Sequence, residues 1–182
     1  CIRDREEGVF QMKENKMIQN LIRLDKVKSQ SIMTPRTVVA TAPESMSLKE
    51  FYQDGKYKFY SRIPIYNDSE DYITGYVLRQ TVLEKLAEDR FDMCLKDVAR
   101  PILSFPENSP VSTVWEQMLE RKEHISILID EYGCFWGIVT MEDIIETALG
   151  FEIVDEKDSV TDMQKLARDK WQKKLAETKI SD

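Results

Sequence analysis

Apolar residues near the start of the chain recur at the spacing of a helix that is hydrophobic along one side. They are Met17, Ile18, Leu21, Ile22 and Leu24. Charged residues fill the positions between them, so we expect an amphipathic linker helix within residues 1–29. Its polar side carries acids as well as lysines, unlike the basic side of a typical helix on a membrane surface. Packing against a neighbouring domain is therefore favoured over membrane binding.

From residue 30 onward the pattern occurs twice, which indicates an internal repeat. Each copy opens with a proline that stops a helix before a short extended run. Pro35 and Pro101 hold these places, 66 positions apart. An amphipathic helix is expected next in each copy. Ser47 and Glu50 have the spacing of a capping box, and Ser109-Pro110 supplies an N-cap residue followed by proline at the first helical position.

Two β-rich runs follow the helix in each copy. The expected strands are 61–66 and 72–77 in the first copy and 125–130 and 135–139 in the second. Turn-forming residues separate the runs, so each pair predicts a hairpin. Gly75 and Gly137 hold equivalent places, 62 positions apart, and the hairpins lead into helices expected at 80–88 and 141–149. The repeated unit is strand, helix, strand, strand, helix.

The fold class predicted from this pattern is α+β, with two repeats packed as a pseudo-twofold pair and flanked by N- and C-terminal helices. The length of 182 residues suits two small units that share a core. The predicted divisions are a linker helix at 1–29, a first repeat at 30–92, a second repeat at 93–152, and an acidic connector with a C-terminal helix at 153–182.

Composition narrows the function. Hydrophobic residues make up 42% of the chain and charged residues 32%, as in soluble globular proteins, and we identify neither a membrane-spanning run nor a signal peptide. Because the chain begins at Cys1, we interpret it as an excised piece whose membrane part lies elsewhere. The net charge of −7 argues against nucleic acid as a partner.

Cysteine and histidine usage also argues against several kinds of site. Cys1, Cys94 and Cys134 are odd in number and far apart, which fits a reducing cytoplasm better than a disulfide framework. His124 is the single histidine, so we expect it to be structural. We find no metal triad, no P-loop and no pairing of nucleophile with base, and predict that the chain is not an enzyme and has no metal site.

Residues 137–143, Gly-Ile-Val-Thr-Met-Glu-Asp, resemble the closing motif Gly-x-Val-Thr-x-x-Asp of the CBS domain. Runs at 32–36, 60–66, 130–133 and 152–156 resemble, as a set, the CorC/cyclin-M (hemolysin-C-like) class of magnesium and cobalt transporters. The resemblance covers roughly residues 8–158. It implies a tandem CBS pair, called a Bateman module, on the cytoplasmic side of an attached transmembrane domain. It also implies a homodimer that binds ATP or AMP, with or without Mg²⁺.

The candidate nucleotide site is centred on the closing motif. Asp143, in the first turn of a helix, suits the two adjacent hydroxyls of a ribose, and Thr140 with the free N–H groups of that turn suits phosphate. The same spacing is also an ordinary capping arrangement. Both interpretations stay open for Asp143.

The resemblance implies that the first copy supplies the other wall of the site. Thr37 and Val38 would lie near the adenine, Tyr60 with Ile63 and Pro64 would pack on it, and Arg62 would reach phosphate. Alternatives are a surface salt bridge for Arg62 and core packing for Tyr60. The full predicted set is Thr37, Val38, Tyr60, Ser61, Arg62, Ile63, Pro64, Ile138, Thr140 and Asp143.

The first copy departs from the closing motif, with Leu78 and Thr81 where Thr and Asp are expected. We therefore predict one competent site per chain and a degenerate twin. The predicted function is a cytoplasmic adenine-nucleotide-binding regulatory module of a divalent-cation (Mg²⁺ or Co²⁺) transporter or efflux protein. A ligand-free CBS dimerisation module is the alternative. The acidic run at 155–158 is expected to be a solvated connector.

Overall fold

The computed structural model describes residues 14–150, so the predicted connector and C-terminal helix lie outside the described residues. Residues 14–23 are helical, as the pattern predicted, and lead into a short 3₁₀ turn, η1 (Leu24–Lys26). Leu24 is buried, whereas Ile18, Leu21 and Ile22 are exposed. In the described part of the chain, no helix has the length and apolar character needed to cross a membrane.

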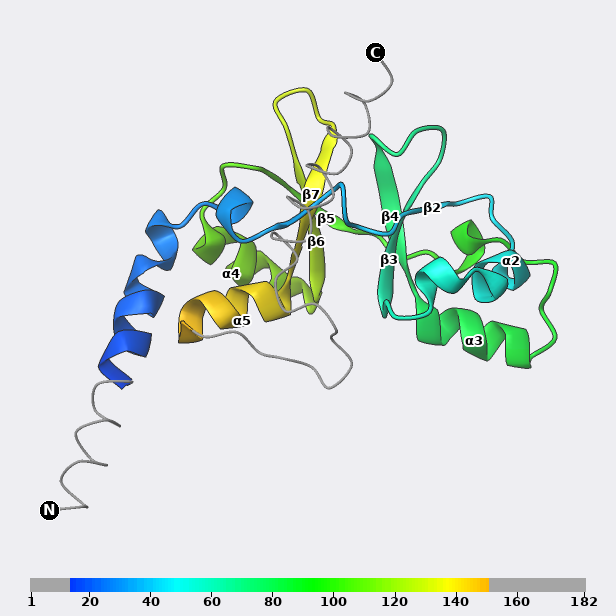
Figure 1. The fold of residues 1–182 in the computed structure, drawn as a ribbon, viewed down its shortest axis with the longest axis horizontal. Helices are drawn as coiled ribbons and strands as arrows, with labels where there is room; N and C mark the ends of the chain where they lie inside the picture. Colours follow the sequence, from blue (N-terminus) through cyan, green and yellow to red (C-terminus); the bar gives the residue numbers. More distant parts are fainter. Residues whose placement is uncertain (1–13, 151–182) are drawn as a thin grey trace, which may run out of the picture.

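Two units stand side by side, with their strands between helices α4 and α5 on one side and helices α2 and α3 on the other (Figure 1). The first unit contains β2 (Ala42–Pro43), α2 (Leu48–Gln53), η3 (Gly55–Tyr57), β3 (Arg62–Tyr66), β4 (Ile73–Leu78), α3 (Arg79–Ala87) and η4 (Leu95–Val98). Its sheet has the order β2-β3-β4. The capping box of α2 is confirmed, because the Ser47 N–H donates to Glu50 Oε2 at 3.0 Å and the Glu50 N–H to Ser47 Oγ at 3.2 Å.

The second unit repeats this order with an additional strand. It contains β5 (Leu103–Pro106), α4 (Val111–Arg121), β6 (Ile125–Ile129), β7 (Phe135–Thr140) and α5 (Met141–Leu149). The short 3₁₀ turn η2 (Ser29–Ser31) and the strand β1 (Thr34–Pro35) precede the first unit in sequence, yet the sheet order is β1-β7-β6-β5. The predicted α+β pair of strand-helix-strand-strand-helix repeats is confirmed.

One helix start was predicted one residue too early. The N-cap of α4 is Pro110, not Ser109, and no side chain caps this helix. Ser109 instead contacts the segment before the first unit: its carbonyl accepts from the backbone N–H of Ser29 at 2.9 Å and from the Ser29 hydroxyl at 2.8 Å.

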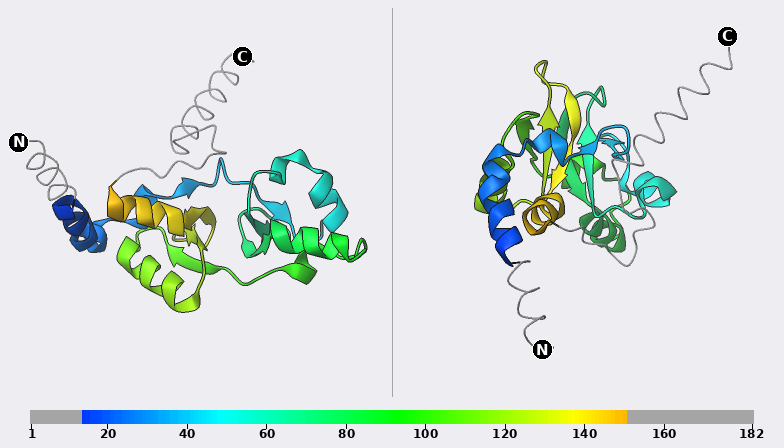
Figure 2. Two further views of the ribbon diagram at one scale, coloured as in Figure 1. Left: turned by 90° about the horizontal axis from the view of Figure 1, so that it is seen from below. Right: turned by 60° about the vertical axis from the view of Figure 1, so that its left-hand side comes forward.

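The outer edge of each sheet is paired by the segment that opens the other copy, through the strand β1 in the second unit and through the single bridging residue Arg100 in the first. Thr34 of β1 pairs with Ile138 of β7, and Arg100 forms the equivalent bridge with Tyr76 of β4. Figure 2 shows the two segments that connect the units. The repeat boundaries near residues 30 and 93 stay predictions, and residues 34–35 hydrogen-bond to the sheet of the second unit.

Both crossings depend on a glycine. A Cβ atom on Gly75 would lie 2.6 Å from the carbonyl oxygen of Arg100, and one on Gly137 would lie 2.6 Å from that of Thr34. Only a residue without Cβ lets the opening strand approach this closely. The two glycines that the sequence pairs therefore mark the two places where the copies exchange strands.

Candidate functional site

The closing motif of the second copy forms the junction between β7 and α5. Thr140 is the N-cap of α5, and Asp143 completes a capping box. The Thr140 N–H and Oγ1 both donate to Asp143 Oδ2, at 2.7 and 2.8 Å, and the Asp143 N–H donates to Thr140 Oγ1 at 3.4 Å. Asp143 is thus a cap, as one interpretation predicted, but the box does not use Oδ1.

The carboxyl group of Asp143 lies in an unfavourable environment for its charge. Burial is the main cause that raises its pKa from 3.8 to about 6, and the carboxylates of Glu146 and Glu142 raise it further, while the bonds from Thr140 oppose the shift. At neutral pH the group is ionised and strongly attracts any hydroxyl donor that reaches it.

The opening segment of the first copy lies directly beside this junction. After β1 pairs with Ile138, the Arg36 N–H donates to the Trp136 carbonyl at 3.0 Å and the Val38 N–H to the Pro35 carbonyl at 3.0 Å. The second bond closes a turn in which Val38 is 6% exposed while Thr37 is exposed. The structure therefore brings the predicted residues of the opening segment to the edge of β7.

This turn has no counterpart in the second copy. The strand registers make Ala42 equivalent to Phe105 and Thr34 equivalent to Arg100. Thr34 and Ala42 are eight positions apart in the first copy, whereas their counterparts Arg100 and Phe105 are only five positions apart in the second. The three extra residues form the turn with Thr37 and Val38. The sequence already indicated extra residues in the first copy, because the two equivalent prolines are 66 positions apart and the two equivalent glycines only 62.

The remaining predicted residues lie at the start of β3, beside the junction of β4 and α3. Arg62 pairs with Leu78, and the Ser61 carbonyl accepts from the Arg79 N–H at 3.0 Å. Ile63 is fully buried in the core of the first unit, and Pro64 is buried beside it. Their predicted contact with adenine stays a prediction.

Two alternatives weighed for this group are not what the structure shows. Tyr60 is 37% exposed, so it is not part of the core. Within residues 14–150 the Arg62 side chain has no ion-pair partner, because the ion pairs found there join Arg36 to Asp71 and Lys85 to Glu88.

The pseudo-twofold relation makes Tyr60 and Ile138 the counterparts of two residues that bond each other. The Arg79 N–H donates to the Ser61 carbonyl just as the Met141 N–H donates to the His124 carbonyl, so Ser61 and His124 are equivalent. The residues before them, Tyr60 and Glu123, are therefore equivalent too. Ile138 is equivalent to Tyr76, and the Tyr76 hydroxyl bonds Glu123 at 2.7 Å. We call the two sides of the contact between the units side A (Thr37, Val38, Tyr60, Arg62, Ile138, Thr140 and Asp143) and side B (Tyr76, Leu78, Thr81, Arg100 and Glu123).

Side B lacks the chemistry of side A. Leu78 is the N-cap of α3 and makes no side-chain capping bond, and the first turn of that helix contains no acid. Thr81 replaces the aspartate. Of the two strand-to-helix junctions, only the one on side A has carboxylates in the first turn of its helix.

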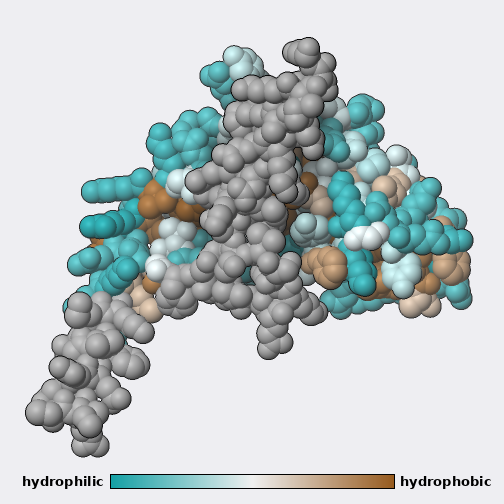
Figure 3. All heavy atoms as spheres, in the orientation of Figure 1, coloured by the Kyte–Doolittle hydropathy of each residue, from teal (hydrophilic) through white to brown (hydrophobic). Residues whose placement is uncertain are grey.

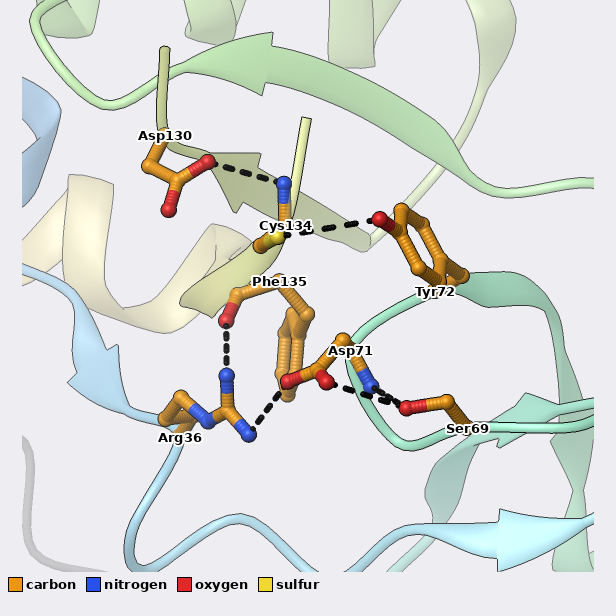
Figure 4. A network of polar contacts seen from close by, with 7 residues as sticks. All are labelled: Arg36, Ser69, Asp71, Tyr72, Asp130, Cys134 and Phe135. Atoms are coloured by element: carbon orange, nitrogen blue, oxygen red, sulfur yellow. Dashed lines mark hydrogen bonds and ion pairs between the residues drawn. The ribbon is translucent and has the colours of Figure 1, made fainter. Parts of the chain in front are cut away.

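Beside side A, a polar network that sequence reasoning missed joins the hairpin tips of the two units (Figure 4). Arg36 bridges Asp71 Oδ1, at 2.8 Å, and the Phe135 carbonyl, at 3.2 Å. The Phe135 N–H donates to the Asp71 carbonyl at 2.7 Å, and Cys134 Sγ lies 4.0 Å from the Tyr72 hydroxyl. Hydrogen bonds from Arg36 and from Ser69 lower the pKa of Asp71. No local pattern indicated this network, because Arg36 and Asp71 lie far apart in the sequence.

Comparison with known proteins agrees with this geometry. The CBS domain family model matches residues 95–150, the second copy. The UPF0053 protein sll1254 of Synechocystis is 33% identical over 97% of this chain, which covers 51% of that relative. A magnesium and cobalt efflux protein CorC of Buchnera aphidicola is 31% identical over 85% of this chain, which covers 52% of it. The chain spans about half the length of these curated relatives.

Solved structures extend the match to both units. The CBS domain of a bacterial CNNM/CorC family Mg²⁺ transporter has a TM-score of 0.75 and 30% identity, with 82% of this chain and 91% of that chain covered. The same kind of domain in complex with ATP has a TM-score of 0.71 and 30% identity, covering 76% and 98%. The chain belongs to the CBS domains of the CNNM/CorC family of Mg²⁺ transporters.

Proposed function

We propose that the chain binds an adenine nucleotide on side A and thereby regulates a divalent-cation transporter, for Mg²⁺ or Co²⁺, on whose cytoplasmic side it lies. The observation that carries the proposal is the coincidence of three features on one side. The carboxylate of Asp143, the extra turn of the opening segment, and Arg62, which has no ion-pair partner within residues 14–150, all belong to side A. The similar CBS domain solved with ATP supports the choice of ligand.

The side chains of side A suit the parts of ATP or AMP. Asp143 can accept from the two ribose hydroxyls through the oxygen that the capping box leaves unused, and Val38 and Ile138 offer apolar surface to the adenine. The neighbouring carboxylates of Glu142 and Glu146 repel phosphate, so a polyphosphate chain, with or without Mg²⁺, is expected to extend toward Arg62.

Regulation follows from where the two walls come from. Tyr60 and Arg62 belong to the first unit, and Ile138 and Asp143 to the second. A nucleotide that contacts both walls favours one arrangement of the units over others, and an attached membrane domain can respond to that shift. The names of the CorC relatives, which are magnesium and cobalt efflux proteins, support this link.

Substitution of Asp143 tests the site. Asp143→Asn keeps the size and capping ability of the side chain but loses its charge. We expect the affinity for ATP and AMP, measured by isothermal titration with and without Mg²⁺, to fall by about 1.5–3 kcal/mol, roughly tenfold or more. The melting temperature should change little.

The chain contains a matched control. Asp97 also completes a capping box, where its Oδ2 accepts from the Cys94 N–H at 2.8 Å, but it lies in the first unit at η4. Asp97→Asn should bind nucleotide like the parent. If Asp143→Asn also binds like the parent, Asp143 is a cap and not a ligand. If the parent gives no heat with either nucleotide, the ligand-free dimerisation module is favoured, and turnover of ATP would indicate an enzyme.

We also propose a homodimer, as the family implies, and the structure changes the surface expected to form it. Most apolar residues of the two amphipathic helices are used in their own cores, including Leu48, Phe51, Val111, Val114 and Met118. Tyr52, Leu83 and Leu119 stay exposed on α2, α3 and α4. In Figure 3 the coloured surface is mainly hydrophilic, with separate hydrophobic patches between the hydrophilic residues. Light scattering at tens of micromolar should give a dimer mass, and a strictly monomeric mass would contradict the proposal.

A further inference from the structure

On side B, a buried tyrosine ties the two units together. Tyr76 is 2% exposed, and its hydroxyl donates to Glu123 Oε2 at 2.7 Å. Its N–H donates to the Arg100 carbonyl at 3.0 Å, and the Arg100 N–H donates to the Tyr76 carbonyl at 2.8 Å. The bond to Glu123 links the two units, whereas the two bonds with Arg100 hold the segment that opens the second copy against β4 of the first unit.

The bond to Glu123 is of a strong kind. A carboxylate acceptor makes a hydrogen bond shorter and stronger than a neutral acceptor does, and the low exposure of the tyrosine protects it from water. Burial, followed by the hydrogen bond to Glu123, raises the pKa of Tyr76. The hydroxyl thus keeps its proton and remains a donor across the physiological range.

Side A has no such bond. Ile138 replaces the tyrosine and Tyr60 replaces the glutamate at the equivalent places. An isoleucine side chain cannot donate a hydrogen bond, so this pair cannot fasten the units. The two sides of a nearly symmetric contact are therefore unequal, with one fastened by a tyrosine–glutamate pair and the other without it.

We infer that Tyr76 and Glu123 form a latch that keeps side B shut and sets the separation of the two walls on side A. The inference rests on the proposed function, because side A is where the nucleotide is placed. The walls belong to different units, so any rotation of one unit against the other changes their separation. Tyr76 and Glu123 are positioning residues, which act on the nucleotide by fixing that rotation.

The test compares two tyrosines that lose the same atom. Tyr76→Phe removes the hydroxyl of the latch. Tyr57→Phe removes a hydroxyl that is equally buried, with Tyr57 also 2% exposed, but that bonds the Thr41 carbonyl at 3.1 Å within the first copy. Amide hydrogen exchange at positions 76 and 100 reports on the latch without any ligand, and titration with ATP reports on side A.

Tyr76→Phe should speed exchange at positions 76 and 100 by about tenfold and weaken ATP binding severalfold. Glu123→Ala should do the same, and Glu123→Gln, which keeps an acceptor oxygen, should lie between it and the parent. Tyr57→Phe should lower the melting temperature by a similar amount while leaving exchange at these two amides and ATP affinity unchanged.

Unchanged exchange at positions 76 and 100 in Tyr76→Phe would show that no latch exists. Faster exchange with an ATP affinity equal to that of Tyr57→Phe would overturn the positioning role. If the parent itself binds no ATP, the proposed function fails, and the exchange measurement still decides whether the latch is present.

Discussion

Gly137→Ala is expected to lower the free energy of unfolding by about 2–3 kcal/mol, because the added methyl group would overpack a site with no room for it. Its Cβ would lie 2.6 Å from the Thr34 carbonyl oxygen and 2.9 Å from Met33 Sδ. The sulfur can move, but the carbonyl belongs to β1 and can retreat only if the strand leaves β7. Denaturant unfolding should show the loss, together with a drop in melting temperature of roughly 4–12 °C.

Other glycines of the chain provide the controls. Gly75→Ala meets the Arg100 carbonyl at the same 2.6 Å and should show a comparable loss. Gly55, which opens η3, has no atom within 4 Å of an added Cβ, so Gly55→Ala should leave the stability nearly unchanged. Equal stability of Gly137→Ala and Gly55→Ala would mean that β1 does not depend on close approach to β7.

Acidification from pH 7 to pH 5 is expected to increase the contribution of Asp143 to stability. Its pKa is about 6 in the folded chain against 3.8 for the ordinary side chain, so the folded state binds the proton more tightly. The contribution is therefore fully present below about pH 4 and is lost as the pH rises through 6. The shift corresponds to at most about 3 kcal/mol.

The difference between the parent and Asp143→Asn isolates this carboxyl group. Glu50 and Glu88 have lowered pKa values, so their contributions are lost only at pH values below their ordinary value of 4.5. Denaturant titrations between pH 5 and 7 should show the parent gaining stability relative to Asp143→Asn as the pH falls. A constant difference across this range would mean that Asp143 does not titrate there.

Local patterns in the sequence predicted the elements well, because each depends on near neighbours in the chain. The box of Ser47 and Glu50 needs only a spacing of three, and the glycine pair marks equivalent strands. The exchange of the opening strands was not predicted. A two-residue strand such as Thr34–Pro35 has too little alternation to indicate its partner, which lies about a hundred residues away.

For the candidate site as well, the sequence predicted the local motif but not the long-range contacts. Thr140 and Asp143 form one local motif, and the structure shows them in contact. Which residues of the first copy face Ile138 depends on how the two units meet, which spacing within one copy does not specify. The bridge from Arg36 to Asp71 and the pair of Tyr76 with Glu123 are similarly long-range, so no local pattern indicated them.

The crossing of β1 to the second unit and of the bridging residue Arg100 to the first means that the repeated sequence and the folding unit are not the same thing. The sheet of the second unit is completed by residues made before the first unit, and the strand pair 34 and 138 closes a loop of about a hundred residues. A copy expressed alone would leave the outer edge of β4 or β7 without its partner strand, and an open edge of this kind pairs readily with another chain. The strand exchange therefore ties the two copies together in inheritance, because a duplication or truncation that divides them exposes an edge prone to aggregation.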